Sequence, residues 1–491
     1  MRLLHVHSFE FASGFQERTL DNAQDRLWHS LGGTSRPKPR YAILSHRWVG
    51  KEITFQDFST LTKDRLRDVP LQHPAALGVQ SQSADVEEQS SLYKIARACK
   101  QAQQLVSMDT PPIEHIWIDT VCINKADQSE LSTAIGSMFR WYAEAVVCYA
   151  YLVDVSWDGS DASRRQFLNS EWFRRGWTLQ ELLAPAQVEF YDRDWNLIGS
   201  RTELAADISL ATNISEDILR LHGSFRDASL GQKMSWLSLR TTQHIEDRAY
   251  CMLGIFNVYL DARYGQGPAE FLRLQHEILR TWNRDTPFDE TLFAWRSSEI
   301  ASSGLFAPAP VCFRDAGSIT FDTGLARPRG SKEKLGAKGF ELTEAGLSIQ
   351  RPWSWNIYPL ITWPLTFGLI LFIMPIYYCF HYKKITTRMR LNAWTQGDDG
   401  KVRSIELSME LLPGKTWRRV ECGLFYPSNG LTISSRRLRA LTTYGEVKIP
   451  NVVNYYDVVS DEFLQQDSLS HSPLLSDVEL PLLSSWDNGE V

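Results

Sequence analysis

The sequence is poor in the residues that build metal and redox sites. Its seven cysteines are odd in number, scattered over 491 residues and never form a C-x-x-C pair. A zinc site needs clustered cysteine and histidine ligands, and the H-E-x-x-H pattern of zinc proteases is absent as well. The sequence also has no glycine-rich loop of the kind that binds phosphate. We therefore expect reduced, intracellular thiols and no metal centre.

The sequence also lacks an excess of positive charge. It has 52 Lys and Arg against 58 Asp and Glu, a formal net charge of −6. A general nucleic-acid binder carries a basic face, so we expect no nucleic-acid partner. The first ten residues lack the apolar stretch of roughly 7–15 residues that marks a secretory signal, which predicts a cytoplasmic protein. With 43 % hydrophobic residues the chain can bury a large core, which excludes wholesale disorder.

Short apolar segments alternate with helical patterns in the first 200 residues. Four segments have the continuous apolar character of strands buried on both faces: Tyr41–Ser45, His115–Asp119, Ala145–Val153 and Gln187–Tyr191. Helices are expected between them, from about Ser91, from a capping position at Asp127 and over Thr178–Leu183. Strands that alternate with helices predict an α/β fold with a parallel sheet.

The composition changes along the rest of the chain. We expect an α/β core over residues 1–200, a helical extension over 201–300 and a β-rich region over 301–459. The last stretch, 460–491, contains seven acidic residues and no Lys or Arg, and it is rich in Ser and Leu. This composition predicts a disordered acidic tail.

An uncharged apolar segment covers residues 357–380. As a helix its 24 residues would measure about 36 Å, enough for a hydrocarbon core of roughly 30 Å. Three prolines, Pro359, Pro364 and Pro375, weaken a continuous helix, although membrane helices tolerate proline better than soluble helices do. Three interpretations stay open: a membrane span, a pair of buried strands in the β-rich region, and an error in the gene model.

Together these segments resemble the fungal heterokaryon-incompatibility (HET) domain family. The resemblance covers roughly residues 1–350, and its motifs follow one another in the order usual for the family: Tyr41-Ala-Ile-Leu-Ser-His-Arg-Trp48, Ile116-Trp-Ile-Asp-Thr-Val-Cys-Ile-Asn124, Met138-Phe-Arg-Trp-Tyr142, Trp172-Phe-Arg-Arg-Gly-Trp-Thr-Leu-Gln-Glu-Leu-Leu-Ala-Pro185, Met234-Ser-Trp236, Glu246-Asp-Arg-Ala-Tyr-Cys-Met-Leu-Gly-Ile-Phe256, Phe271-Leu-Arg-Leu-Gln275, Leu292-Phe-Ala-Trp295 and Gly304-Leu-Phe-Ala-Pro308. The chain departs from the family at Gln266, where an acid is usual, and in its apolar segment 357–380.

The resemblance implies a role in non-self recognition between fungal strains, called vegetative incompatibility, which ends in growth arrest or programmed cell death. It implies as partners other incompatibility proteins or further copies of the domain, and a membrane if 357–380 inserts. HET domains are similar to TIR domains, which have a flavodoxin-like fold and of which some cleave NAD. The TIR signature W-x-x-x-E-L carries the catalytic acid, and Trp177-Thr-Leu-Gln-Glu181-Leu182 has this spacing. NAD would then be a substrate, and no cofactor is required.

Glu181 is the candidate catalytic residue that this resemblance implies. Breaking the bond between ribose and nicotinamide develops positive charge on the sugar, which a carboxylate beneath it would stabilise. The structural alternative is a capping box over Thr178–Glu181, in which Glu181 binds only the backbone at a helix start. Both interpretations stay open at the level of sequence.

Ser45, His46, Arg47 and Trp48 end the first expected strand, where a doubly wound sheet binds its ligand. Arg47 could pair with phosphate oxygens and Trp48 could stack on a base. Alternatively, Trp48 closes the core and Arg47 pairs with a nearby acid. We include all four residues among the candidates for ligand binding.

Asp119 and Trp177 complete the candidate ligand-binding set. Asp119 ends the second expected strand, and a role as a hydrogen-bonding anchor for the next turn is favoured over a catalytic one. A nucleophile made of Cys122, His46 and Asp119 can be drawn, but a small buried thiol is the more common use of cysteine. Two classes of function stay open: an NAD glycohydrolase-like enzyme, and a non-enzymatic interaction module that relays a death signal.

Overall fold

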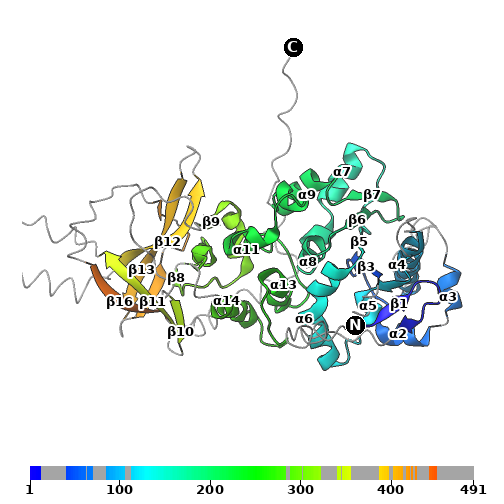
Figure 1. Ribbon diagram of the computed structural model, residues 1–491, viewed down its shortest axis with the longest axis horizontal. Helices are drawn as coiled ribbons and strands as arrows, with labels where there is room; N and C mark the ends of the chain where they lie inside the picture. Colours follow the sequence, from blue (N-terminus) through cyan, green and yellow to red (C-terminus); the bar gives the residue numbers. More distant parts are fainter. Residues whose placement is uncertain are drawn as a thin grey trace, which may run out of the picture.

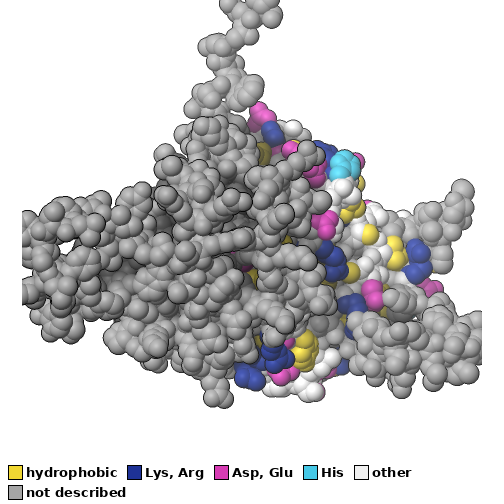
Figure 2. Space-filling model, turned by 60° about the vertical axis from the view of Figure 1, so that its left-hand side comes forward, with side chains coloured by type: hydrophobic (Ala, Val, Ile, Leu, Met, Phe, Trp, Pro, Cys, Tyr) yellow, Lys and Arg dark blue, Asp and Glu magenta, His cyan; other side chains and the backbone are white. Residues whose placement is uncertain are grey.

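The computed structural model describes fifteen stretches of the chain, which are residues 1–12, 40–61, 63–69, 84–104, 112–282, 288–300, 302–321, 340–343, 346–354, 386–396, 402–412, 416–420, 422–423, 426–427 and 442–449. A sheet with surrounding helices, a helical region and a second sheet follow one another along the chain (Figure 1). On the face shown in Figure 2, basic and acidic side chains of the described part are interspersed.

The first sheet has seven strands in the order β2-β1-β4-β3-β5-β6-β7. Their bounds are β1 Leu3–His5, β2 Phe11–Ala12, β3 Tyr41–His46, β4 His115–Trp117, β5 Val147–Tyr151, β6 Val188–Tyr191 and β7 Leu197–Ser200. The four central strands, β4, β3, β5 and β6, are parallel, and the edge strands β1, β2 and β7 pair antiparallel. The predicted α/β fold with a parallel sheet is confirmed for this central part.

The central strands are buried because helices cover both faces of the sheet. Every residue of β3 and of β5 is buried, which explains why their sequences are apolar without alternation. In chain order the parallel strands lie as second, first, third and fourth, so the strand order reverses between β3 and β5. In open α/β sheets such a reversal is where ligands bind, outside the carboxyl ends of the strands.

The helices of this region are α2 Phe55–Thr60, α3 Asp64–Arg67, α4 Ala84–Gln104, α5 Asp119–Cys122, α6 Gln128–Glu144, α7 Asp161–Leu168, the 3-10 helix η2 Glu171–Arg174, and α8 Thr178–Leu183. Helix α6 begins where the sequence predicts, because the Asp127 side chain accepts hydrogen bonds from the first turn. Helix α4 begins earlier than predicted, at Ala84. The prediction that Asp119 ends a strand is wrong: β4 ends at Trp117 and Asp119 opens α5, where an acid suits the helix N-terminus.

The helical region contains α9 Ala205–Thr212, α10 Glu216–Leu219, η3 Phe225–Asp227, α11 Leu230–Ser235, α12 Asp247–Tyr250, α13 Leu253–Phe256, α14 Ala269–Thr281 and η4 Glu290–Phe293. It packs closely on the α/β region through α13 and α6. A Cβ placed on Gly254 would lie 2.1 Å from the Phe139 ring, so only glycine permits this approach.

A second sheet of nine strands is formed by residues further along the chain. Its elements are β8 Ser302–Ser303, β9 Thr320–Phe321, β10 Phe340–Thr343, β11 Gly346–Ser354, β12 Thr386–Gln396, β13 Val402–Leu412, β14 Thr416–Val420, β15 Tyr426–Pro427 and β16 Thr442–Ile449, with η5 at Pro310–Ser318. The division of the chain into domains at residues 200, 300 and 459 stays a prediction.

Two further predictions concern residues outside the described part. The apolar segment 357–380 and the acidic tail 460–491 both lie there. Among the helices that are described, none combines the length and the apolar character that a bilayer crossing requires.

Candidate functional site

Glu181 lies on α8 against the carboxyl end of β3. The Ser45 hydroxyl donates a hydrogen bond to Oε2 of Glu181 and accepts one from the indole N–H of Trp172 at 2.9 Å. The Glu181 residue is only 7 % exposed. The structure therefore joins the first central strand to the W-x-x-x-E-L segment through one buried hydroxyl. The Tyr142 hydroxyl also hydrogen-bonds to the Glu181 carboxyl group, and we call Glu181, Ser45, Trp172 and Tyr142 the Glu181 cluster.

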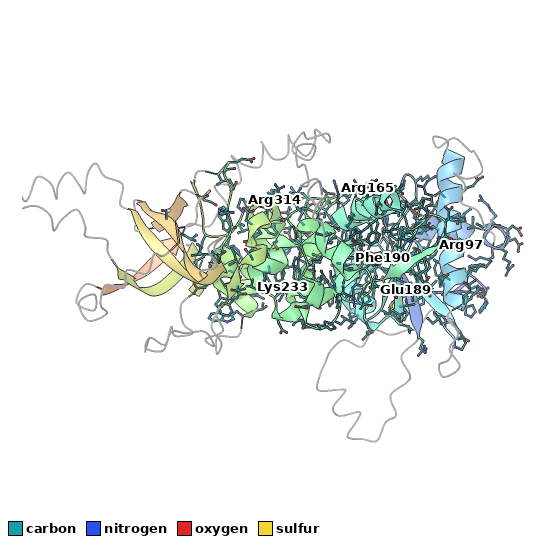
Figure 3. All side chains as sticks on the ribbon, turned by 90° about the horizontal axis from the view of Figure 1, so that it is seen from above. Arg97, Arg165, Glu189, Phe190, Lys233 and Arg314 are labelled. Carbon is teal, nitrogen blue, oxygen red and sulfur yellow. The ribbon has the colours of Figure 1, made fainter. Side chains whose placement is uncertain are left out.

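An aromatic group holds Trp172 in this position. Its ring packs edge-on against Phe173 at 5.2 Å and against Phe190 of β6 at 5.5 Å between centroids. Phe167 packs edge-on against Phe190 in turn, at 5.6 Å (Figure 3 labels Phe190). Because these rings fill the space around Trp172, its N–H has a fixed direction toward Ser45.

The predicted capping box at Thr178 is wrong. Helix α8 has Trp177 at its N-cap and no side-chain cap. The Thr178 hydroxyl instead donates to the carbonyl oxygens of Trp172 and Arg175, at 2.6 and 2.8 Å. Glu181 therefore does not bind the backbone at the helix start, and its carboxyl group is directed at Ser45.

The surroundings of Glu181 favour its protonated form. Burial raises its pKa to about 8, and the negative charge of Asp119 acts in the same direction. The hydroxyl groups of Ser45 and Tyr142 and the charge of Arg175 act in the opposite direction, because they stabilise the carboxylate. At neutral pH the carboxyl group is thus mostly neutral, and it ionises above pH 8 or when a cation comes close.

A second group of polar residues lies near the end of the same strand. The Trp48 indole N–H donates to Oδ2 of Asp119 at 3.0 Å, and Lys125 Nζ lies 3.4 Å from that oxygen. The same ammonium group lies 3.3 Å from the centroid of the Trp48 ring, a cation–π contact. We call Trp48, Asp119, Lys125 and His46 the Asp119 cluster.

His46 is the buried member of the Asp119 cluster. Its Nε2 lies 3.8 Å from Oδ1 of Asp119, and neither ring nitrogen has a hydrogen-bond partner among the described residues. Burial lowers the pKa of His46 to about 4, with the nearby Lys94 adding to the effect. The imidazole is therefore neutral at physiological pH. Asp119 has the opposite tendency to Glu181: although burial opposes it, Lys125 and His46 lower its pKa.

Arg47 and Trp177 are not drawn into either cluster. Arg47 is half-buried and forms no ion pair or hydrogen bond with any described residue. The Trp177 side chain hydrogen-bonds to Asp247, whose Oδ1 also accepts from the Tyr264 hydroxyl at 2.9 Å. Of the seven candidates from the sequence, the structure brings together Ser45 with Glu181, and His46 and Trp48 with Asp119.

Part of the chain is similar to known proteins. Residues 41–167 match the family model described as heterokaryon incompatibility protein (HET). The chain is also 46 % identical over 169 residues to the vegetative incompatibility protein HET-E-1 of Podospora anserina. Residues 41–167 are thus a HET segment. The aligned part covers 33 % of the chain and 12 % of HET-E-1, so the chain spans about an eighth of the curated relative that it matches. No solved structure matches the chain.

The matched HET segment contains the whole Asp119 cluster and Ser45, whereas Glu181 and Trp172 lie beyond its last residue. The Glu181 cluster thus joins the matched segment to the residues that follow it. This makes the position of α8 relative to β3 the structural feature on which the candidate site depends.

Sequence reasoning missed the residues that fix α8. Arg240, from the helical region, donates through Nη1 to the Arg175 carbonyl and to the Thr178 hydroxyl, each at 2.9 Å. The Gly176 N–H donates to the Thr241 carbonyl at 2.8 Å, and a Cβ on Gly176 would lie 2.5 Å from Thr242. Gly176 is a local signal of this close approach.

The cysteine nucleophile has no support from the geometry. Cys122 is buried, burial raises the pKa of its thiol to about 12, and its sulfur accepts a hydrogen bond from the Ile118 N–H at 3.5 Å. The thiol is therefore protonated and held in the core at neutral pH. Within the described residues, no group of three or more His, Cys, Asp or Glu side chains could hold a metal ion.

Proposed function

We propose that this HET protein acts in vegetative incompatibility as a cell-death effector, and that its α/β region is TIR-like and cleaves NAD. The family match and the similarity to a vegetative incompatibility protein support the biological role. The order of the parallel strands supports the TIR-like fold, because flavodoxin-like sheets begin with the same 2-1-3-4 order.

The observation that carries the enzymatic proposal is the position of Glu181. It lies against the end of β3, beside the point where the strand order reverses, and it is a buried carboxyl group whose pKa is raised to about 8. In the reaction, the bond from C1′ of the ribose to the nicotinamide nitrogen breaks first, which leaves positive charge on the sugar. Nicotinamide leaves with the electron pair, the oxygen of water then bonds to C1′, and a proton of that water goes to solvent. The Glu181 carboxylate would stabilise the positive sugar between these events.

The positive pyridinium ring of NAD would itself assist this chemistry. A cation near Glu181 lowers the pKa of the carboxyl group and favours the charged form that the reaction needs. Ser45 and Trp172 keep the carboxyl group in place, and Arg47 is available for the phosphates because no described residue pairs with it.

The side chains of both clusters contact one another and leave little room for a ligand, which favours a second function. Glu181 is 7 % exposed, and Lys125 covers one face of the Trp48 ring. A domain whose candidate groups are engaged with each other could instead relay a death signal through contacts with other incompatibility proteins or with its own copies. The enzymatic proposal requires that self-association of the domain exposes Glu181 to the substrate.

The two functions are separated by one substitution. Nicotinamide release from NAD is measured for the purified, artificially clustered chain, and survival is counted in a yeast host that expresses it. Glu181→Gln should abolish both NAD cleavage and killing, while Glu216→Gln, an exposed acid on α10, should change neither. Killing by a Glu181→Gln variant of normal abundance would reject the enzyme and support the relay.

A further inference from the structure

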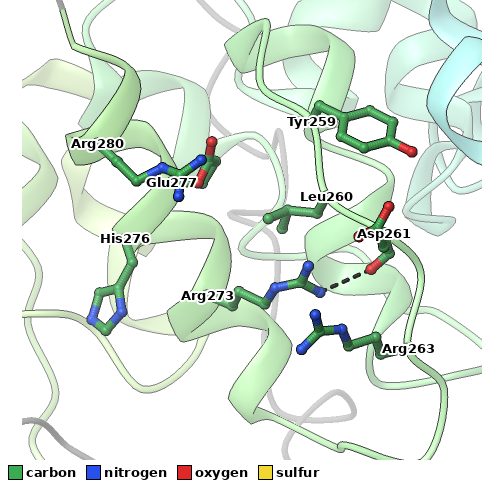
Figure 4. A pocket seen from close by; sticks show the side chains of 8 residues that line it. All are labelled: Tyr259, Leu260, Asp261, Arg263, Arg273, His276, Glu277 and Arg280. Carbon is green, nitrogen blue, oxygen red and sulfur yellow. Dashed lines mark hydrogen bonds and ion pairs between the residues drawn. The ribbon is translucent and has the colours of Figure 1, made fainter.

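A cavity of about 450 Å³ lies in the helical region, between α14 and the loop over residues 259–263 (Figure 4). One wall is a single face of α14, formed by residues at positions i, i+3, i+4 and i+7: Arg273, His276, Glu277 and Arg280. The loop contributes Tyr259, Asp261 and Arg263. None of the Glu181 or Asp119 cluster residues lines this cavity.

Three guanidinium groups line the cavity, and two of them are paired with acids. Arg273 Nη1 lies 2.8 Å from Glu270 Oε2, and Arg280 Nε lies 3.1 Å from Glu277 Oε2. No described residue forms an ion pair or hydrogen bond with the guanidinium of Arg263. Figure 4 shows the Arg263 and Arg273 side chains directed into the same space. Because Glu270 balances the charge of Arg273, the uncompensated positive charge of the described lining is that of Arg263.

Both acids of the lining have partners of their own, and Glu277 is paired with Arg280. Asp261 directs its carboxylate at the Tyr259 hydroxyl and its carbonyl oxygen at Arg273 Nη1, 2.8 Å away. His276 has a buried Nε2 without a hydrogen-bond partner among the described residues. Burial lowers the pKa of His276 to about 4, so this ring is neutral at physiological pH and adds no charge of its own.

We propose that this cavity binds a small molecule that carries both phosphate and an aromatic ring, such as a nucleoside diphosphate. The guanidinium fork of Arg263 matches two phosphate oxygens, and Arg273, whose charge Glu270 balances, lies beside it as a further N–H donor. Tyr259 is 61 % exposed at the rim, which offers a face for an aromatic base to stack on. The volume lies within the roughly 300–1,000 Å³ of small-molecule sites.

The test is calorimetric titration of the full chain with ADP, adenosine and inorganic phosphate at low ionic strength. ADP should bind more tightly than either fragment, because only ADP uses both the guanidinium and the tyrosine. Arg263→Gln should weaken ADP binding by at least about tenfold, and Tyr259→Ala should weaken ADP but leave inorganic phosphate unchanged. Arg220→Gln is the matched control, since Arg220 is paired with Glu216 on α10, outside the cavity.

Trp48→Ala distinguishes this cavity from the proposed NAD site, which would also accept ADP. Binding at the cavity should survive Trp48→Ala and be weakened by at least about tenfold in Arg263→Gln, with each variant shown to be folded by its melting temperature. ADP affinity that is equal in the natural chain and in Arg263→Gln would overturn the proposal. So would adenosine that binds as tightly as ADP, because phosphate recognition would then be absent.

Discussion

The Glu181 and Asp119 clusters meet at neighbouring residues of one strand but hold their carboxyl groups in opposite states. Ser45 contacts Glu181 and the next residue, His46, lies near Asp119. Successive residues of a strand point to opposite faces of the sheet, so the two clusters have different surroundings. Glu181 is enclosed by aromatic rings and hydroxyl groups, and its pKa is raised. Asp119 has Lys125 and a histidine beside it, and its pKa is lowered.

This difference has a chemical meaning. Two carboxyl groups whose surroundings move their pKa values apart can hold and release protons at different pH, which is how many sites divide acid and base roles. Here the neutral Glu181 is the group that can change its charge near physiological pH, whereas Asp119 keeps its charge and orients Trp48 and Lys125. The following predictions test whether the two clusters are independent.

The largest effect on stability is expected from a residue of β4, the strand next to β3, which carries residues of both clusters. Trp117 of β4 is fully buried and packs against Trp141 and Tyr142 at 5.5 and 5.9 Å between ring centroids. Trp117→Ala should lower the free energy of unfolding by about 3–5 kcal/mol, because the large cavity is only partly filled by relaxation. Chemical denaturation measures this. Trp117→Phe should lower the free energy of unfolding by less. A Trp117→Ala variant with an unchanged melting temperature would contradict the burial of Trp117 in β4.

A change confined to the Glu181 cluster should have a smaller effect. Ser45→Ala removes the donor to Glu181 and the acceptor of the Trp172 N–H, which should cost about 1–3 kcal/mol because both partners stay buried. The pKa of Glu181 should rise further, since the hydrogen bond from Ser45 lowers it. Carbon-detected NMR of the carboxyl groups measures this shift. An equal shift at Asp119 would show that the clusters are coupled.

The sequence allowed the sheet to be predicted better than the site. Strands β3 and β5 and helix α8 were predicted close to their observed bounds, because buried parallel strands and short helices have local apolar patterns. The contact between Ser45 and Glu181 joins residues 136 positions apart, and that between Arg240 and Thr178 joins residues 62 apart. No local pattern contains these pairs. The helix start at Asp119 was missed because three residues of β4 merge into the following apolar stretch.

The pH dependence of stability should have opposite signs in the two clusters. Glu181 has a pKa of about 8 in the folded chain against an ordinary 4.5. The folded state therefore binds the proton more tightly, and the Glu181 contribution to stability falls as pH rises from 4.5 to 8. His46 has a pKa of about 4 against 6.5, so its contribution is present above pH 6.5 and is lost as pH falls toward 4.

Denaturation at a series of pH values separates these contributions. Glu181→Gln should remove the loss of stability between pH 6.5 and 8, while leaving the loss below pH 6.5 in place. Glu216→Gln, the exposed control, should leave both parts of the profile unchanged. A Glu181→Gln profile that follows the natural chain up to pH 8 would mean that Glu181 titrates like an exposed acid.

The smallest effect is expected in the Asp119 cluster, at Lys125. This side chain is 33 % exposed, so its contact with Trp48 and its ion pair with Asp119 together should contribute only about 0.5–1 kcal/mol. Lys125→Met should leave the fold intact, change the fluorescence of Trp48 and raise the pKa of Asp119, because Lys125 lowers it. Lys100→Met, on the exposed side of α4, is the matched control and should change none of these. If Lys125→Met also moved the pKa of Glu181 by as much as that of Asp119, the two carboxyl groups would form one electrostatic unit and the division of roles between them would fail.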